Sequence, residues 1–127
     1  MAKKEFSYKG RTIADLKKMS LGEFAQIVPA RQRRGLTRGF NDRQKILLKR
    51  IRRGDKNIET HCRDMVIIPE MVEMTLKIHN GKIFEPVTIT AEMLGHYLGE
   101  FVMTRKRVAH SAPGIGATKS SAALSVK

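Results

Sequence analysis

Residues 74–90 read MTLKIHNGKIFEPVTIT, two runs of β-favouring residues on either side of an Asn-Gly pair. Apolar residues alternate with polar ones from Met74 to Ile78 and again at Val87 and Ile89, a spacing typical of strands with one buried face. Asn-Gly at 80–81 predicts a tight type I′ turn, because both central positions of that turn need positive φ. We therefore expect a β-hairpin here.

The segments around this hairpin complete a small sheet. The run MVIIP at 65–69 predicts a third strand, and the prolines Pro69 and Pro86 indicate strand ends or an edge, because proline donates no ladder hydrogen bond. Thr90 is a candidate cap for a short helix at 91–101 that turns Met93, Leu94 and Leu98 inward. The expected class is α+β, a three-stranded sheet with a short packed helix, whose strand order the sequence leaves open.

The part before the sheet is predicted to be helical and basic. Thr12 can cap one helix, and Ser20 with Glu23 forms a capping box for a second one that Pro29 ends. A longer amphipathic helix is expected from Asn41 to Arg53. Its apolar side combines four residues, Ile46, Leu47, Leu48 and Ile51.

Charge divides the chain into three segments. The net charge is +13 at a pI of about 10.4, and it is +12 over residues 1–57, −4 over 58–104 and +5 over 105–127. Between residues 31 and 53 there are ten Lys or Arg and one acid. A charge run is usually a solvated helix face, but such faces mix signs since like charges one turn apart repel. An unpaired basic stripe favours a polyanionic partner, most commonly nucleic acid.

Several other classes of partner are excluded at this point. No stretch approaches the roughly 20 apolar residues of a membrane span, and a membrane-surface helix would need bulky anchors in a chain that has no Trp. The single cysteine, Cys62, forms no internal disulfide, and no secretory signal is recognisable, so we expect a cytosolic protein.

The stretch APGIGATKSS at 112–121 has the lysine and hydroxyl of a phosphate-binding loop. Alignment with G-x-x-x-x-G-K-[ST] places Pro113 and Thr118 where glycines belong, and no strand precedes it. We therefore expect no nucleotide cofactor. Residues 111–127 instead predict a flexible tail whose glycines allow close approach to a nucleic-acid backbone.

No set of residues indicates catalysis. His61 and Cys62 are adjacent, but the other histidines are single, which leaves a zinc site without its four ligands and a thiol without a base. Glu92 and Glu100 are better explained by helix-terminal charge and solvent exposure than by acid–base chemistry. Few aromatic residues accompany the basic strands, which argues against a base-stacking sheet. We expect neither an enzyme nor a metal or cofactor site.

Residues 60–101, THCRDMVIIPEMVEMTLKIHNGKIFEPVTITAEMLGHYLGEF, closely resemble the small-subunit ribosomal protein S-nineteen family. I-x-P-x-M, HNGK, GH-x-LGEF and the stretch from Thr104 to His110 follow the family's order. RQRRGL, THCRDM and PGIGATKSS resemble its archaeal and eukaryotic branch, and the short start indicates an archaeal chain. Bacterial members usually have Trp-Ser-Arg-Arg at 61–64, so a bacterial contact transfers best at Arg63.

The resemblance implies a structural protein in the head of the small subunit, in the cytoplasm. The implied partners are the small-subunit rRNA, the neighbouring head protein S-thirteen and, near the tail, tRNA. The implied fold is a small α/β core with extended termini. The expected organisation is a basic helical region at 1–57, a sheet-and-helix core at 58–110 and an extended tail at 111–127.

The candidate RNA contacts are basic residues without acidic neighbours and the tip of the hairpin, where backbone donors would sit on a rigid support. They are Arg33, Arg34, Lys45, Lys49, Arg52, Arg63, Asn80, Gly81, Lys82, Arg105, Lys106, Arg107, His110 and Lys119. The alternative is a DNA-binding architectural protein, which would share the basic segments but would have no use for the hairpin core.

Overall fold

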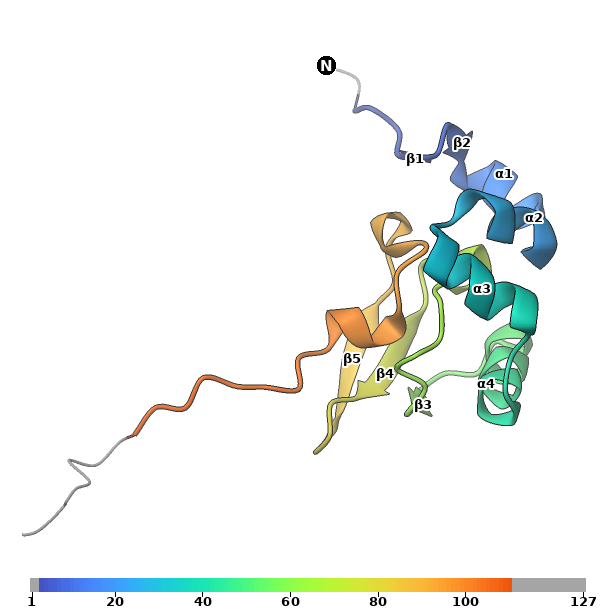
Figure 1. The fold of residues 1–127 in the computed structure, drawn as a ribbon. Coiled ribbons are helices and arrows are strands. Elements are labelled where there is room, and N and C mark those ends of the chain that lie inside the picture. Colours follow the sequence, from blue (N-terminus) through green and yellow to red (C-terminus); the bar gives the residue numbers. More distant parts are fainter. Residues whose placement is uncertain (1–2, 111–127) are drawn as a thin grey trace, which may run out of the picture.

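The computed structural model describes residues 3–110 and confirms the α+β class. Four α-helices precede a three-stranded sheet, and three short 3-10 helices lie around that sheet (Figure 1). The elements are β1 (Ser7–Tyr8), β2 (Arg11–Thr12), α1 (Ile13–Lys18), α2 (Leu21–Ile27), α3 (Ala30–Arg38), α4 (Asp42–Arg53), β3 (Ile58–Thr60), η1 (Pro69–Met71), β4 (Thr75–His79), β5 (Phe84–Thr88), η2 (Ala91–Met93) and η3 (Leu98–Phe101).

The helix starts follow the capping chemistry expected from the sequence. The Thr12 side chain accepts from the Asp15 N–H, and Ser20 and Glu23 form the predicted capping box. A second capping box, Asn41 with Gln44, begins α4, and Gly54 ends that helix in the left-handed region. These caps satisfy backbone groups that a helix end leaves without partners.

One residue of α4 points away from the face predicted for it. The buried stripe is Gln44, Leu47, Leu48 and Ile51, spaced by three and four residues. Ile46 is 53% exposed, so its assignment to the apolar face was wrong. It lies two positions after Gln44 and therefore about 200° around the helix from the start of the stripe.

The predicted hairpin is present, and its neighbour is a different strand from the one expected. β4 and β5 pair antiparallel, and β3 pairs parallel with β4 to give the order β3-β4-β5. Pro86 lies on the edge strand β5, as predicted. The expected third strand at 65–68 was wrong. Those residues are fully buried, and the backbone there bonds to the segment 95–98 instead, including Ile67 N–H to His96 O at 2.8 Å.

The turn of the hairpin also differs from the prediction. Gly81 has a φ of +102°, but Asn80 is not among the residues with positive φ, so the turn is not type I′. The Asn80 N–H instead donates to Ile83 O, and the Asn80 Oδ1 accepts from the backbone of Lys82 and Ile83. The asparagine side chain thus replaces the backbone geometry that the Asn-Gly rule assumes.

The single helix expected at 91–101 is two 3-10 helices. η2 and η3 are separated by Gly95, whose φ of +80° interrupts helical geometry. The Gly95 N–H donates to Ile67 O, which ties this segment to the buried run at 65–68. Leu94 and Leu98 are buried as predicted, whereas Met93 is only partly buried.

The hydrophobic core crosses the compositional boundary at residue 57. Leu16, Phe24 and Leu47 from the basic helices belong to the same buried cluster as Leu76 and Val102 from the sheet region. This core fixes α1, α2 and α4 relative to the sheet, and α3 packs on it only through the partly buried Leu36. No helix among the described residues is both long enough and apolar enough to cross a membrane.

The ring of Tyr8 lies directly against Gly95. Replacing Gly95 with alanine should lower the free energy of unfolding by about 2–3 kcal/mol, because a Cβ there would lie 2.7 Å from the Tyr8 hydroxyl and adopt a left-handed φ. Gly54→Ala is the matched control, with a φ of +78° and open space around it, and should lose only about 1–2 kcal/mol. Urea denaturation of both variants checks this, and equal losses would show that Tyr8 moves aside freely.

Candidate nucleic-acid interface

Helix α3 carries a row of three arginines along one side. Arg31, Arg34 and Arg38 are spaced by three and four residues, which places them on one face of a helix with no buried residue. All three are exposed, and among the described residues none of their guanidinium groups makes an ion pair or an intramolecular hydrogen bond. The row therefore presents unneutralised charge at fixed spacing.

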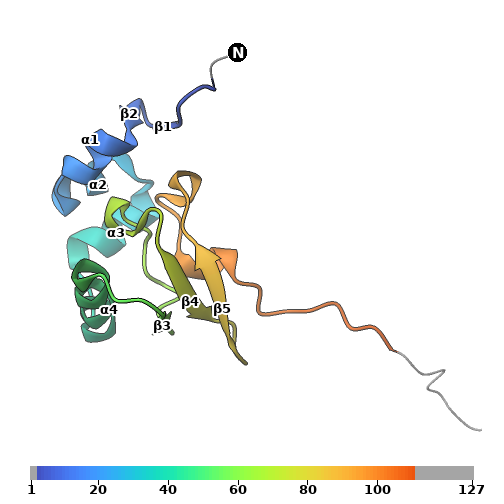
Figure 2. The same cartoon turned by 180° about the vertical axis from the view of Figure 1, so that it is seen from behind.

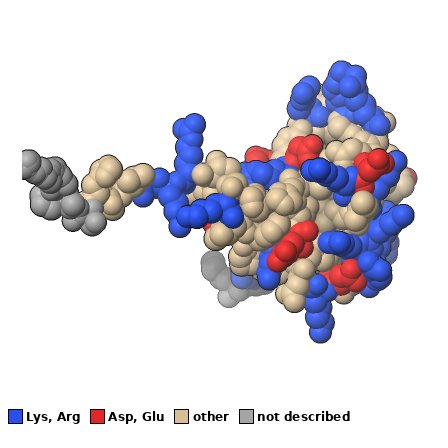
Figure 3. Space-filling model, turned by 90° about the horizontal axis from the view of Figure 1, so that it is seen from below, with Lys and Arg blue, Asp and Glu red and all other residues tan. Residues whose placement is uncertain are grey.

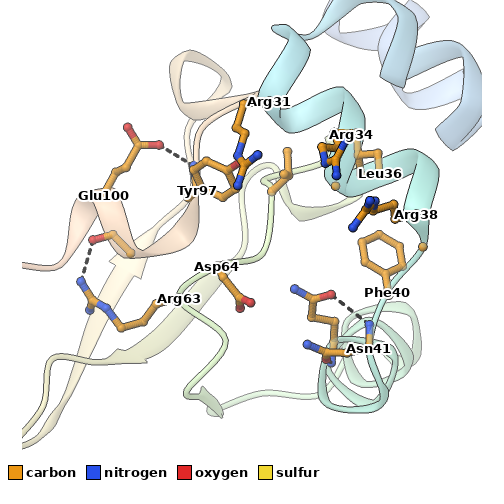
Figure 4. A pocket seen from close by; sticks show the side chains of 15 residues that line it. Arg31, Arg34, Leu36, Arg38, Phe40, Asn41, Arg63, Asp64, Tyr97 and Glu100 are labelled. Carbon is orange, nitrogen blue, oxygen red and sulfur yellow. Dashed lines mark hydrogen bonds between the residues drawn. The ribbon is translucent and has the colours of Figure 1, made fainter.

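These arginines line an open groove of about 900 Å³ (Figure 4). α3 and the start of α4 form one wall, and the opposite wall comes from residues 63–66 and 97–100. Phe40 and Tyr97 contribute half-buried rings to the lining. Guanidinium groups beside aromatic faces suit a ligand that has both anionic groups and flat rings, as a nucleic acid does.

Two carboxylates lie on the wall opposite the arginines. Glu100 is engaged, because it accepts from the Tyr97 backbone N–H and lies 3.3 Å from the His96 Nδ1. Asp64 makes no ion pair within residues 3–110. The groove is therefore mixed in sign: its three unpaired arginines lie on α3, and Arg63 lies on the opposite wall with the two carboxylates.

The adjacent Arg33 serves the fold rather than the groove. Its side chain donates to the carbonyls of Ala25, Gln26 and Val28 at 3.1–3.4 Å. These are the carbonyls that the end of α2 leaves without helical partners. Of the two neighbouring candidate contacts, Arg34 faces the groove and Arg33 holds the α2–α3 corner.

The Arg63 side chain also donates its hydrogen bonds to backbone carbonyls. Nη1 donates to His79 O at 2.8 Å, and Nη2 donates to Gly99 O at 2.8 Å and Val102 O at 2.9 Å. This one side chain therefore joins the end of β4 to η3 and to the residue that follows it. Gly99 packs so closely that a Cβ there would lie 2.9 Å from the Arg63 Cβ.

The three candidate residues on α4 differ from one another. Lys45 and Lys49 are exposed and have no acidic partner among the described residues. Arg52 donates twice to Glu70, at 2.9 and 3.1 Å, and the hydrogen bonds and charge of this carboxylate raise the pKa of the guanidinium. An exposed pair of this kind contributes about 0–1 kcal/mol to stability, but it does neutralise much of the charge that Arg52 could offer.

The hairpin tip is closed by its own hydrogen bonds. The Gly81 N–H donates to the His79 Nδ1, and the Lys82 N–H donates to the Asn80 Oδ1. The Asn80 amide donates to Glu85. The expectation that backbone donors at the tip are available to a phosphate was therefore wrong, and the exposed ammonium group of Lys82 is the cation that the tip presents.

After η3 the chain leaves the globular part as an extended segment (Figure 1). The candidate contacts of this segment are all exposed: Arg105, Lys106, Arg107 and His110. Figure 3 shows basic side chains along it and over the globular part, with fewer acidic ones between them. Lys119 and the stretch at 112–121 lie outside the described residues.

Sequence reasoning missed part of the groove. Arg31 and Arg38 were not among the candidates, although their spacing from Arg34 was visible once α3 was taken as a helix. Phe40 and Tyr97 gave no local signal, because they come together only through the fold. Within residues 3–110 there is no cluster of three or more potential metal-ligating side chains, and Cys62 is buried.

Comparison with known proteins gives the family. The family model for Ribosomal protein S19 matches residues 34–110, more than half of the chain. The small ribosomal subunit protein uS19 of Methanocella arvoryzae is 49% identical over 125 residues, which cover 98% of this chain and 89% of that protein. The corresponding protein of Methanoculleus marisnigri is 50% identical over 125 residues, covering 98% and 91%. The resemblance seen in the sequence is confirmed, and the chain belongs to the archaeal branch of the ribosomal protein S19 family, a family of structural proteins and not of enzymes.

Proposed function

We propose that this chain is a structural constituent of the small ribosomal subunit and binds ribosomal RNA through the α3 groove and the exposed face of α4. Family membership supports the ribosomal role, since the relatives in both archaea are named small ribosomal subunit proteins. The observation that supports RNA binding at this surface is the row of Arg31, Arg34 and Arg38, three exposed arginines on one helix.

The row suits phosphates for a physical reason. A guanidinium presents its donors in a planar fork that matches two phosphate oxygens, and it stays charged at all relevant pH values. Because α3 packs on the core through the partly buried Leu36 and is tied to the end of α2 by Arg33, the helix that carries these side chains is in place before RNA arrives. Less conformational entropy is then lost on binding than with flexible side chains on a flexible segment.

The remaining candidate contacts fall into two groups, those with exposed and available side chains and those whose groups are engaged in intramolecular hydrogen bonds. Exposed cations available to RNA are Arg34, Lys45, Lys49, Lys82, Arg105, Lys106 and Arg107, with His110 beside them. Arg33, Arg63 and Arg52 would act mainly by shaping this surface, and Asn80 and Gly81 by shaping the hairpin tip. Lys119 is proposed on the sequence alone.

The finer placement rests on the family resemblance. We place the protein in the head of the small subunit, in the cytoplasm, beside the head protein S-thirteen. Residues 111–127 are proposed to run toward the decoding region and the tRNAs. The absence of a phosphate-loop pattern at 112–121 supports a role for this tail along RNA rather than at a nucleotide.

A competition titration tests the proposal. The full-length chain should bind the rRNA domain of the small-subunit head tightly at physiological salt, and an equal mass of duplex DNA should compete poorly. Charge alone gives binding that falls steeply with salt on either polymer, whereas a fitted surface retains a preference for the rRNA. Equal affinity for both polymers would contradict the proposal and favour the DNA-binding architectural alternative.

A further inference from the structure

Three aromatic rings that are separate in the sequence meet at one end of the sheet. His61 follows β3, His79 is the last residue of β4, and Phe84 is the first residue of β5. His79 and Phe84 are direct partners across the hairpin. Since Leu76 and Ile78 point into the core, the alternation along β4 places His79 on the opposite face of the sheet.

The rings form one cluster with mixed geometry. The imidazoles of His61 and His79 lie 4.4 Å apart between centroids at an interplanar angle of 35°. The phenyl ring of Phe84 meets them nearly edge-on, at 5.1 Å from His61 and 4.9 Å from His79. The Gly81 N–H donates to the His79 Nδ1 at 3.0 Å, which fixes the orientation of that ring.

This cluster is not part of the core. His61 is exposed and the other two rings are half-buried. Thr75, Pro86 and Thr88 on the same face of the hairpin are exposed as well, and in the part of the chain that the structure describes no helix packs over this face (Figure 2). Clustered rings on an open face leave apolar surface in contact with water, and a partner that covers them would bury this surface.

One ring of the cluster, His61, also lines a second groove that carries two arginines. This groove, of about 380 Å³, runs between α4 and β3 and ends at His61 and Cys62. Arg43 and Arg50 line it, neither in an ion pair with a described residue, and Glu59 lies beside them. A ring surface beside two unneutralised guanidinium groups complements a single nucleotide, with its base on the rings and its phosphate on the arginines.

We propose that His61, His79 and Phe84 form a stacking platform for an unpaired RNA base, with Arg43 and Arg50 holding the adjacent phosphates. This revises the expectation from the sequence that the sheet does not stack bases, because the three rings come together only in the fold. The inference rests on the proposed function, because it takes RNA as the partner, and it adds a second site on the face of the sheet away from the α3 groove. A protein partner would suit this surface less well, because the cations flanking the rings need anions.

The experiment uses the full-length chain and a single-stranded uridine decamer with one central 2-aminopurine, whose fluorescence falls when it stacks. The chain has no Trp, so the probe is observed without interference from indole emission. Binding should quench the probe, and His61→Ala should abolish the quenching and weaken binding about 5- to 150-fold, the range for the loss of one stacked base. His61→Phe should retain the quenching, because it keeps the ring without the imidazole.

His96→Ala is the matched control, since His96 is also exposed and also meets a ring, Phe101 at 5.7 Å, but lies outside the platform. It should bind and quench like the parent chain. Unchanged quenching in His61→Ala, or equal losses in both alanine variants, would overturn the platform while leaving RNA binding intact. Failure of the parent chain to bind the decamer and the rRNA domain would overturn both the platform and the proposed function.

Discussion

Replacing Arg63 with alanine should lower the free energy of unfolding by about 3–5 kcal/mol, among the largest effects a single substitution produces. The side chain donates to three carbonyls, those of His79, Gly99 and Val102. Hydrogen bonds to a charged donor contribute roughly 1.5–3 kcal/mol each, and the loss is partial because solvent can reach some of the freed carbonyls. Urea denaturation followed by circular dichroism measures the change.

Two variants make this result specific. Arg63→Lys should recover little of the stability, since one ammonium group does not reproduce a planar fork that spans three carbonyls. Arg105→Ala removes the same charge from the exposed extended segment and should melt like the parent chain. If Arg63→Ala kept full stability but lost rRNA affinity, the residue would be an RNA contact, and its structural assignment would be wrong.

Removing the arginine row of α3 should have the largest effect on RNA binding. The triple variant Arg31→Gln, Arg34→Gln and Arg38→Gln keeps good helix formers and deletes three cations from one face. At roughly 1 kcal/mol for each contact, the affinity for the head rRNA domain should fall about 100-fold. The slope of log K against log salt should become shallower by about 2–3, at roughly 0.7–0.9 for each phosphate contact.

A control with the same change in net charge distinguishes binding at the α3 groove from binding driven by the overall charge of the chain. Lys4→Gln, Arg11→Gln and Lys18→Gln remove three exposed cations from the other end of the helical region. This variant should lose much less affinity than the α3 variant. Equal losses in the two variants would mean that overall charge drives binding and that the groove has no special part.

Local signals in the sequence predicted most of the helical region and the hairpin. The Ser20 capping box, the Asn41 helix start and the β4–β5 pairing depend on residues close together in the chain. The strand β3 has no such signal, because it is three residues long and pairs with β4 at a distance of 18 residues, Ile58 with Leu76. The run at 65–68 looked like a strand because a buried apolar run is compatible with either a strand or an irregular core segment.

The sequence predicted which residues of the candidate site are charged, but not which groups their side chains contact. The sequence shows that Arg33, Arg34 and Arg63 are basic, and only the fold shows that two of them donate to carbonyls while Arg34 faces a groove. Likewise Arg52 meets Glu70 from 18 residues away. The charge of a side chain follows from its residue type, whereas the group that it bonds to depends on contacts between residues that are distant in the chain.

The shared core has a consequence for how the chain is made. Synthesis proceeds from the N-terminus, so the basic helices emerge first. Yet Leu16, Phe24 and Leu47 belong to a buried cluster that is completed only by residues 58–102, which emerge later. Until then the early helices expose both apolar stripes and unbalanced positive charge, and short helices of this kind are marginal in water without tertiary packing. Burial therefore waits for the end of translation, and the nascent chain is most exposed to polyanions and to aggregation while it is still attached to a ribosome.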